Sequence, residues 1–136
     1  MKSLVLDAST LIELAYATPT GEKIKNLLGD ADEAFTTELA LTELYYILCR
    51  TLGARLADEK LNDLISSNYV IPYGEPLISE AGKIKCERKM SLADCHVIAL
   101  AMKINGSAVF ARREKELDRE NKRRVFEVEL VFGEEL

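Results

Sequence analysis

The chain has 136 residues, 48% hydrophobic and 30% charged, which suits one hydrophobic core and excludes an intrinsically disordered chain. No apolar stretch approaches the roughly 20 residues that span a bilayer, and no signal peptide is evident, so we expect one cytoplasmic domain over residues 1–136. With one histidine and no pair of cysteines at ligand spacing, the chain offers too few ligands for a usual zinc site, and the net charge of −5 argues against a broad nucleic-acid surface. Any metal should therefore have oxygen ligands.

The spacing of apolar residues predicts short strands that alternate with helices. In chain order we expect strand 3–6, helix 9–14, helix 22–28, strand 33–36, helix 37–52, helix 54–67, strand 69–71, helix 75–87, helix 91–103, strand 107–110, helix 112–121 and strand 125–131. Ser9 or Thr10 should cap the first helix, residues 19–21 should form a turn, and Pro72 should stop the third strand. Connections of a dozen residues or more favour a mostly parallel sheet with helices on both faces, so the fold class is α/β.

Three acidic residues occupy positions where a local rule prefers an apolar or neutral residue. Asp7 closes a buried strand, Glu43 lies inside an apolar helix, and Asp94 opens another apolar helix behind the cap Ser91. Two ionised carboxylates about 4 Å apart repel by roughly 4 kcal/mol at an effective dielectric near 20, so a shared pocket needs a cation. Mg²⁺ or Mn²⁺ suits such an all-oxygen site, and hydrolysis of a phosphate ester is the natural reaction.

The segments around these acids resemble the acidic motifs of a known family. They are Val5-Leu6-Asp7-Ala8-Ser9, Thr42-Glu43-Leu44 and Ser91-Leu92-Ala93-Asp94-Cys95. The chain resembles PIN-domain ribonucleases over essentially its whole length, and especially the VapC-type toxins of toxin–antitoxin pairs. The resemblance implies a PIN-like fold and an endoribonuclease dependent on Mg²⁺ or Mn²⁺, in which Asp7, Glu43 and Asp94 hold the metal and a metal-activated water attacks RNA. It also implies that Ser9 orients a carboxylate or a metal-bound water.

The fourth acidic motif of the family is altered in this chain. Glu114 takes the position of the usual aspartate, and Arg112 stands where a small hydroxyl residue is usual. The resemblance makes Glu114 a catalytic candidate, and the departure implies either an altered second metal site or weakened activity. We therefore expect one well-held metal ion and leave the second open.

Each acidic residue also has a structural interpretation. Asp7 can be a helix N-cap, and Asp94 can be a first-turn acid favoured by the helix dipole. Glu43 can face solvent or pair with Arg50, and Glu114 can be a solvated surface acid in a charged helix.

Two rival functions follow from the same residues. A non-catalytic PIN-like scaffold that binds RNA or protein is suggested by the departure at Arg112 and Glu114. A receiver-like phosphoacceptor would use Asp7, with Lys115 as a weak phosphate-binding candidate. Residues 112–124 carry seven basic and four acidic side chains, which suits either guidance of RNA phosphates or a helix with internal ion pairs.

The helices near residues 41–48 and 56–65 carry more apolar surface than one small sheet covers, including Tyr45 and Tyr46. A homodimer contact or an antitoxin contact would cover this surplus. The resemblance to toxins further implies a small antitoxin protein that covers the acidic pocket.

Overall fold

The computed structural model describes residues 2–136 and contains a five-stranded, all-parallel sheet with the order β3-β2-β1-β4-β5. The strands are β1 (Ser3–Leu6), β2 (Glu33–Thr37), β3 (Ile71–Tyr73), β4 (Ser107–Phe110) and β5 (Leu130–Phe132). The chain adds β2 and β3 on one side of β1 and then crosses to place β4 on the other side. The strand order therefore reverses between β1 and β4.

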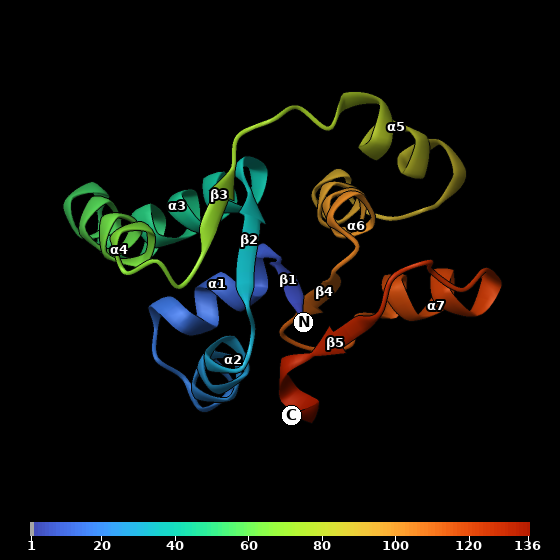
Figure 1. Ribbon diagram of the computed structural model, residues 1–136. Coiled ribbons are helices and arrows are strands. Elements are labelled where there is room, and N and C mark those ends of the chain that lie inside the picture. The colour runs from blue at the N-terminus through green and yellow to red at the C-terminus, as the bar shows by residue number, and fades with distance from the viewer. Residues whose placement is uncertain (1) are drawn as a thin grey trace.

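Helices cover both faces of the sheet, as the sequence predicts (Figure 1). One face packs against α1 (Ala8–Ala15), α2 (Pro19–Gly29), α3 (Glu38–Leu52) and α4 (Ala54–Ser66). The other packs against α5 (Ile78–Glu87), α6 (Leu92–Ile104) and α7 (Lys115–Arg123), and a short 3-10 turn, η1 (Gly133–Glu135), follows β5.

Alternation along the central strands explains why there are two cores. Leu4 and Leu6 of β1 belong to the core under α1 to α4, whereas Val5 between them belongs to the core under α5 to α7. All three are fully buried, which is why β1 reads as a continuous apolar run. No helix in residues 2–136 combines the length and apolar character needed to cross a membrane.

The starts of the first two helices differ from the prediction. Asp7, not Ser9 or Thr10, is the N-cap of α1, and its Oδ1 accepts a hydrogen bond from the Thr10 amide at 2.9 Å. The expected turn at residues 19–21 is the first turn of α2, because Pro19 suits the first helical position and Thr18 caps it through the Gly21 amide.

Two strands are also displaced from their predicted positions. Pro72 lies inside β3 instead of stopping it, because β3 is at the edge of the sheet, where a missing amide donor is tolerated. The last strand pairs only from Leu130, because the buried Arg88 side chain holds the preceding segment through the Arg124 carbonyl and Phe126 turns into the core.

The starts of α5 and α7 lie about three residues later than predicted. A residue before proline avoids the helical conformation, so Pro76 prevents a helix from beginning at Glu75. In the segment after β4, the Ala111 amide donates to the Ser9 hydroxyl, and α7 begins only at Lys115. Residues up to Glu114 therefore form a loop at the carboxyl end of the sheet.

Candidate active site

A pocket of about 210 Å³ opens at the carboxyl ends of β1 and β4, where the strand order reverses. Open α/β sheets bind their ligands at this kind of switch point. The four acids suggested by the sequence all line this pocket: Asp7, Glu43, Asp94 and Glu114. They come from the end of β1, the second turn of α3, the first turn of α6 and the loop before α7.

Asp7 is the most enclosed of the four, with 5% of its surface exposed. Its carboxylate accepts from the Thr10 amide and from the Ser9 hydroxyl, which lies 2.8 Å from both Oδ1 and Oδ2. These bonds favour the ionised form, but burial outweighs them and raises the pKa of Asp7 to about 6. Asp7 is thus both a helix cap and a wall of the pocket.

Ser9 joins the two strands that flank the site. Its hydroxyl donates to Asp7 and accepts a 3.0 Å hydrogen bond from the Ala111 amide, 102 positions further along the chain. The bond fixes the start of the loop that carries Glu114 against the end of β1. Ser9 is therefore a connecting residue, not the helix cap expected from the sequence.

Asp94 occupies the first turn of α6, where the Ser91 hydroxyl accepts from its amide at 3.1 Å, as the sequence predicts. Burial raises the pKa of its carboxyl to about 7, and the charges of Asp7 and Glu114 contribute to the rise. Glu43 lies at the edge of the buried face of α3, where burial and then the charge of Glu114 raise its pKa. Within residues 2–136 it makes no ion pair with Arg50, whose guanidinium stacks on the Tyr46 ring at 5.0 Å.

Glu114 faces the pocket although much of its side chain is exposed. It takes the N-cap position of α7 in an extended conformation, so it projects from the loop and not from the charged helix in which the sequence placed it. Its charge contributes to the raised pKa values of Asp7, Glu43 and Asp94. Arg112 turns to α1 instead, where its Nη2 lies 2.9 Å from Glu13 Oε1.

The basic segment 112–124 is largely engaged in ion pairs. Four of its seven cations pair with acids: Arg112 with Glu13, Arg113 with Asp118 and Glu135, Arg123 with Glu120, and Arg124 with Glu87. Most of these partners lie on α1, α5 and η1, so ion pairs join the segment to neighbouring elements more than they link residues within the helix, and Lys115, Arg119 and Lys122 are the remaining basic residues.

Apolar side chains that the acidic motifs do not include complete the pocket. Ile47 follows Glu43 by four positions, Val97 follows Asp94 by three, and Ile12 lies on α1 beside them. Residues three or four apart share one face of a helix, so this spacing is the signal that could have identified them from the sequence.

The donor set of the pocket suits a hard divalent cation. No Lys or Arg from residues 2–136 lines the pocket, and the pKa values of Asp7 and Asp94 are raised mainly by burial, with a further contribution from neighbouring negative charge. Within the same residues, no three His, Cys, Asp or Glu side chains stand close enough to form a preassembled metal cluster. A cation that keeps several waters, as Mg²⁺ does, needs only one or two direct carboxylate ligands.

The sequence matches the family model of the PIN domain over residues 4–122, which is most of the chain. The chain belongs to the PIN-domain family. PIN domains are generally nucleases and typically use divalent metal ions. A search of curated proteins finds no match to this PIN domain.

Solved structures share the fold of this PIN domain at low sequence identity. VapBC from Salmonella typhimurium bound to DNA is 16% identical, with 98% of this chain and 99% of that chain covered and a TM-score of 0.72. VapC20 of Mycobacterium tuberculosis, a sarcin-ricin loop cleaving toxin, is 20% identical over 77% of this chain and 86% of that chain, with a TM-score of 0.61. FitAcB from Neisseria gonorrhoeae is 14% identical, with 98% of this chain and 99% of that chain covered and a TM-score of 0.64.

Proposed function

We propose that this PIN domain is an endoribonuclease that hydrolyses RNA phosphodiester bonds with the help of Mg²⁺ or Mn²⁺. The observation that carries the proposal is the meeting of four acidic side chains in one pocket at the switch point of the sheet, with no lining cation among residues 2–136. Such a pocket repels RNA phosphates until a divalent ion is bound. It therefore favours metal-assisted hydrolysis over simple phosphate binding.

Asp7, Glu43 and Asp94 are the proposed metal-binding residues, one or two of them as direct ligands and the rest through metal-bound water. When bound, the divalent ion would neutralise the carboxylates, draw charge from the scissile phosphate and lower the pKa of water. Ser9 keeps both oxygens of Asp7 oriented and ties the Asp7 backbone region to the loop after β4. We propose that Glu114, whose exposed side chain lines the pocket, accepts a proton from the water that attacks the phosphate.

The raised pKa values set a pH dependence for metal binding. Without a cation, Asp7 and Asp94 titrate near pH 6 and pH 7, so protons compete with the metal in this range. Affinity for Mg²⁺ should therefore rise from pH 5.5 to pH 8 as these carboxyls lose their protons.

We propose in addition that the protein is the toxin half of a toxin–antitoxin pair and has a small protein partner that covers the acidic pocket. The support is the shared fold with VapBC from Rickettsia felis bound to a promoter DNA fragment and with FitAB bound to DNA. A homodimer is the second proposed assembly, supported by exposed apolar side chains on the helices, such as Tyr46 at 44% exposure. Light scattering of the purified chain at two concentrations tests the dimer directly.

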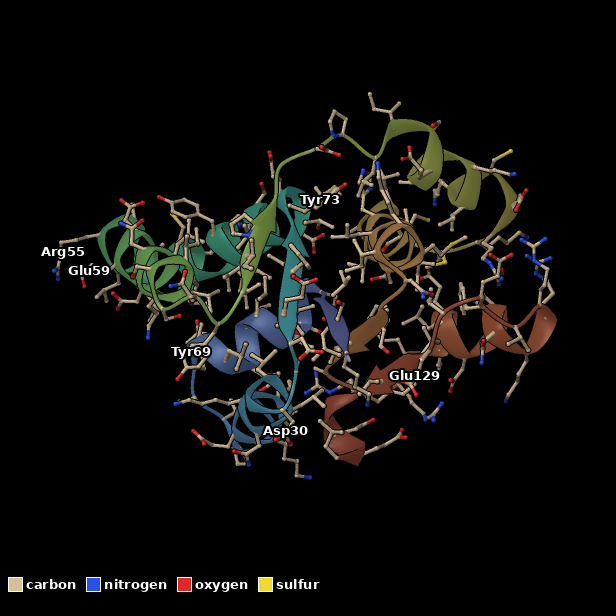
Figure 2. All side chains as sticks on the ribbon, viewed as in Figure 1. Asp30, Arg55, Glu59, Tyr69, Tyr73 and Glu129 are labelled. Carbon is tan, nitrogen blue, oxygen red and sulfur yellow. The ribbon has the colours of Figure 1, made fainter. Side chains whose placement is uncertain are left out.

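The decisive experiment is incubation of the purified protein with a mixed pool of structured and single-stranded RNA in Mg²⁺ or Mn²⁺. Cleavage should disappear with EDTA and in Asp7→Asn, and the midpoint of thermal unfolding should rise with Mg²⁺ in the wild type and in Asp30→Asn but not in Asp7→Asn. Asp30→Asn is the matched control, because Asp30 (Figure 2) is exposed in the connection from α2 to the amino end of β2, whereas the pocket lies at the carboxyl end of the sheet. Intact RNA together with no Mg²⁺-dependent thermal shift would move the assignment to a non-catalytic scaffold.

A further inference from the structure

A second pocket lies beside the acidic one, on the same two helices. It has a volume of about 330 Å³ and is formed where the start of α3, the connection from β3 to α5 and one position of α6 meet. Its principal lining residues are Glu38, Leu39, Tyr73, Leu77, Ile78 and His96.

The two pockets are close because α3 and α6 contribute to both. Glu38 lines the second pocket and Glu43 the first, and five residues of helix advance by only about 7.5 Å. On α6, His96 of the second pocket lies between Asp94 and Val97 of the first. A strand of RNA with a phosphate at the acids would therefore have a neighbouring nucleotide at the second pocket.

The walls of the second pocket suit a flat, mostly apolar ring. Tyr73 lies at the C-terminal end of β3, on the side of the sheet that faces α6 (Figure 2). Its ring packs edge-on against Phe35 with 6.3 Å between centroids, and its hydroxyl donates to Glu75 at 3.1 Å, so the ring is held in place. Ile78 is 81% exposed at the start of α5, which leaves an apolar surface uncovered beside the aromatic ring. Single-stranded RNA is recognised by such stacking surfaces.

The Glu38 carboxylate is a hydrogen-bond acceptor that lines this pocket. No side chain within residues 2–136 donates a hydrogen bond to the Glu38 carboxylate or forms an ion pair with it. The His96 Nδ1 lies 2.9 Å from the Leu92 carbonyl and donates to it, since a carbonyl oxygen only accepts. The Glu75 carboxylate, by contrast, is already engaged by Tyr73 and lies 3.9 Å from the Lys103 ammonium.

We propose that the second pocket binds a guanine base of the RNA substrate, with the Glu38 carboxylate accepting from the guanine N1–H and N2–H₂ groups. Guanine is the base that presents two adjacent donors on its Watson–Crick edge. Adenine, cytosine and uracil each have at least one acceptor on the Watson–Crick edge. The carboxylate would repel that acceptor. Glu38 is thus a specificity residue, and the inference rests on the proposed ribonuclease function for its biological role.

Free nucleosides in EDTA test the pocket without metal, phosphate or cleavage. Backbone amide shifts in a nitrogen–proton NMR spectrum should change at Glu38, Leu39 and His96 on addition of guanosine. Inosine, which lacks the N2 amino group, should bind at least about tenfold more weakly, whereas 7-deazaguanosine should bind like guanosine. Glu38→Gln should abolish this difference because the glutamine amide brings a donor to the guanine donors.

Glu22→Gln is the matched control for this variant. Glu22, like Glu38, is an exposed glutamate in the first turn of a helix. Removing its charge weakens the interaction with the helix dipole to the same extent as in Glu38→Gln but leaves the pocket intact. Equal shifts for all nucleosides, shifts remote from the pocket, or equal losses in both variants would overturn the proposal.

Mapping the cut sites in the RNA pool separates this inference from the proposed function. Guanosine next to most cut sites in the wild type, and not in Glu38→Gln, is the expected result. Cleavage with no base preference would leave the nuclease standing and overturn the guanine site. Guanosine binding at the pocket without any cleavage would support the guanine site and overturn the proposed nuclease function.

Discussion

Replacement of the buried carboxylate at the end of β1 should stabilise the metal-free protein. Asp7→Asn removes the charge but keeps an oxygen that can accept from the Thr10 amide and the Ser9 hydroxyl, and asparagine is as good a helix cap as aspartate. Burial raises the pKa of Asp7 from 3.8 to about 6. At 1.36 kcal/mol per pKa unit, the ionised carboxylate costs the folded state about 3 kcal/mol at neutral pH.

The sign of the pH dependence follows from the direction of this shift. Below pH 3.8, Asp7 is protonated in both folded and unfolded chains, so the wild type and the variant should be about equally stable. Between pH 4 and pH 6 the unfolded chain releases its proton while the folded chain retains it, so the wild type loses stability as the pH rises. Above pH 6 the advantage of Asp7→Asn should level off near 3 kcal/mol.

Urea unfolding in EDTA, followed by circular dichroism at intervals from pH 4 to pH 8, measures this difference. Asp30→Asn should stay within about 0.5 kcal/mol of the wild type throughout, because Asp30 is exposed. Saturating Mg²⁺ should reverse the order at pH 8, because the ion stabilises only the chain that retains the carboxylate. A variant that is less stable than the wild type at pH 7 in EDTA, or a difference that does not change with pH, would refute the reasoning.

Two further substitutions test the contacts that support the site and the fold. Ser9→Ala should lower the free energy of unfolding by about 1–3 kcal/mol, because it leaves the Ala111 amide without its hydrogen-bond partner. Ser79→Ala, at an exposed position of α5, is the control and should change the free energy of unfolding little. Equal losses for the two variants in urea titrations would contradict this prediction. Arg88→Met should cost about 3 kcal/mol, because the 7% exposed guanidinium contacts the Glu120 carboxylate and donates to the Glu120 and Arg124 carbonyls. Arg55→Met, which breaks the exposed pair with Glu59 (Figure 2), should cost less than about 1 kcal/mol, and similar losses for both arginines would be inconsistent with a buried role for Arg88.

The sequence by itself was enough to predict the α/β class, the parallel sheet and nearly every helix and strand. Apolar periodicity reports burial within one element, and capping signals such as Ser91 act within one helical turn, so both can be detected locally. The same local logic singled out Asp7, Glu43 and Asp94, because an acid in an apolar segment is unusual wherever the segment packs.

Only the tertiary structure decided how the loop after β4 is used. The bond from the Ala111 amide to Ser9 joins residues 102 positions apart, and it is this contact that anchors the loop from which Glu114 faces the pocket. In the sequence, Glu114 is one acid among many charges in a helical pattern. The pairing of Arg112 with Glu13 likewise depends on the packing of α1 beside β4. Contacts between distant segments leave no local periodicity, and for that reason the folded chain alone shows which charges surround the pocket and which neutralise one another.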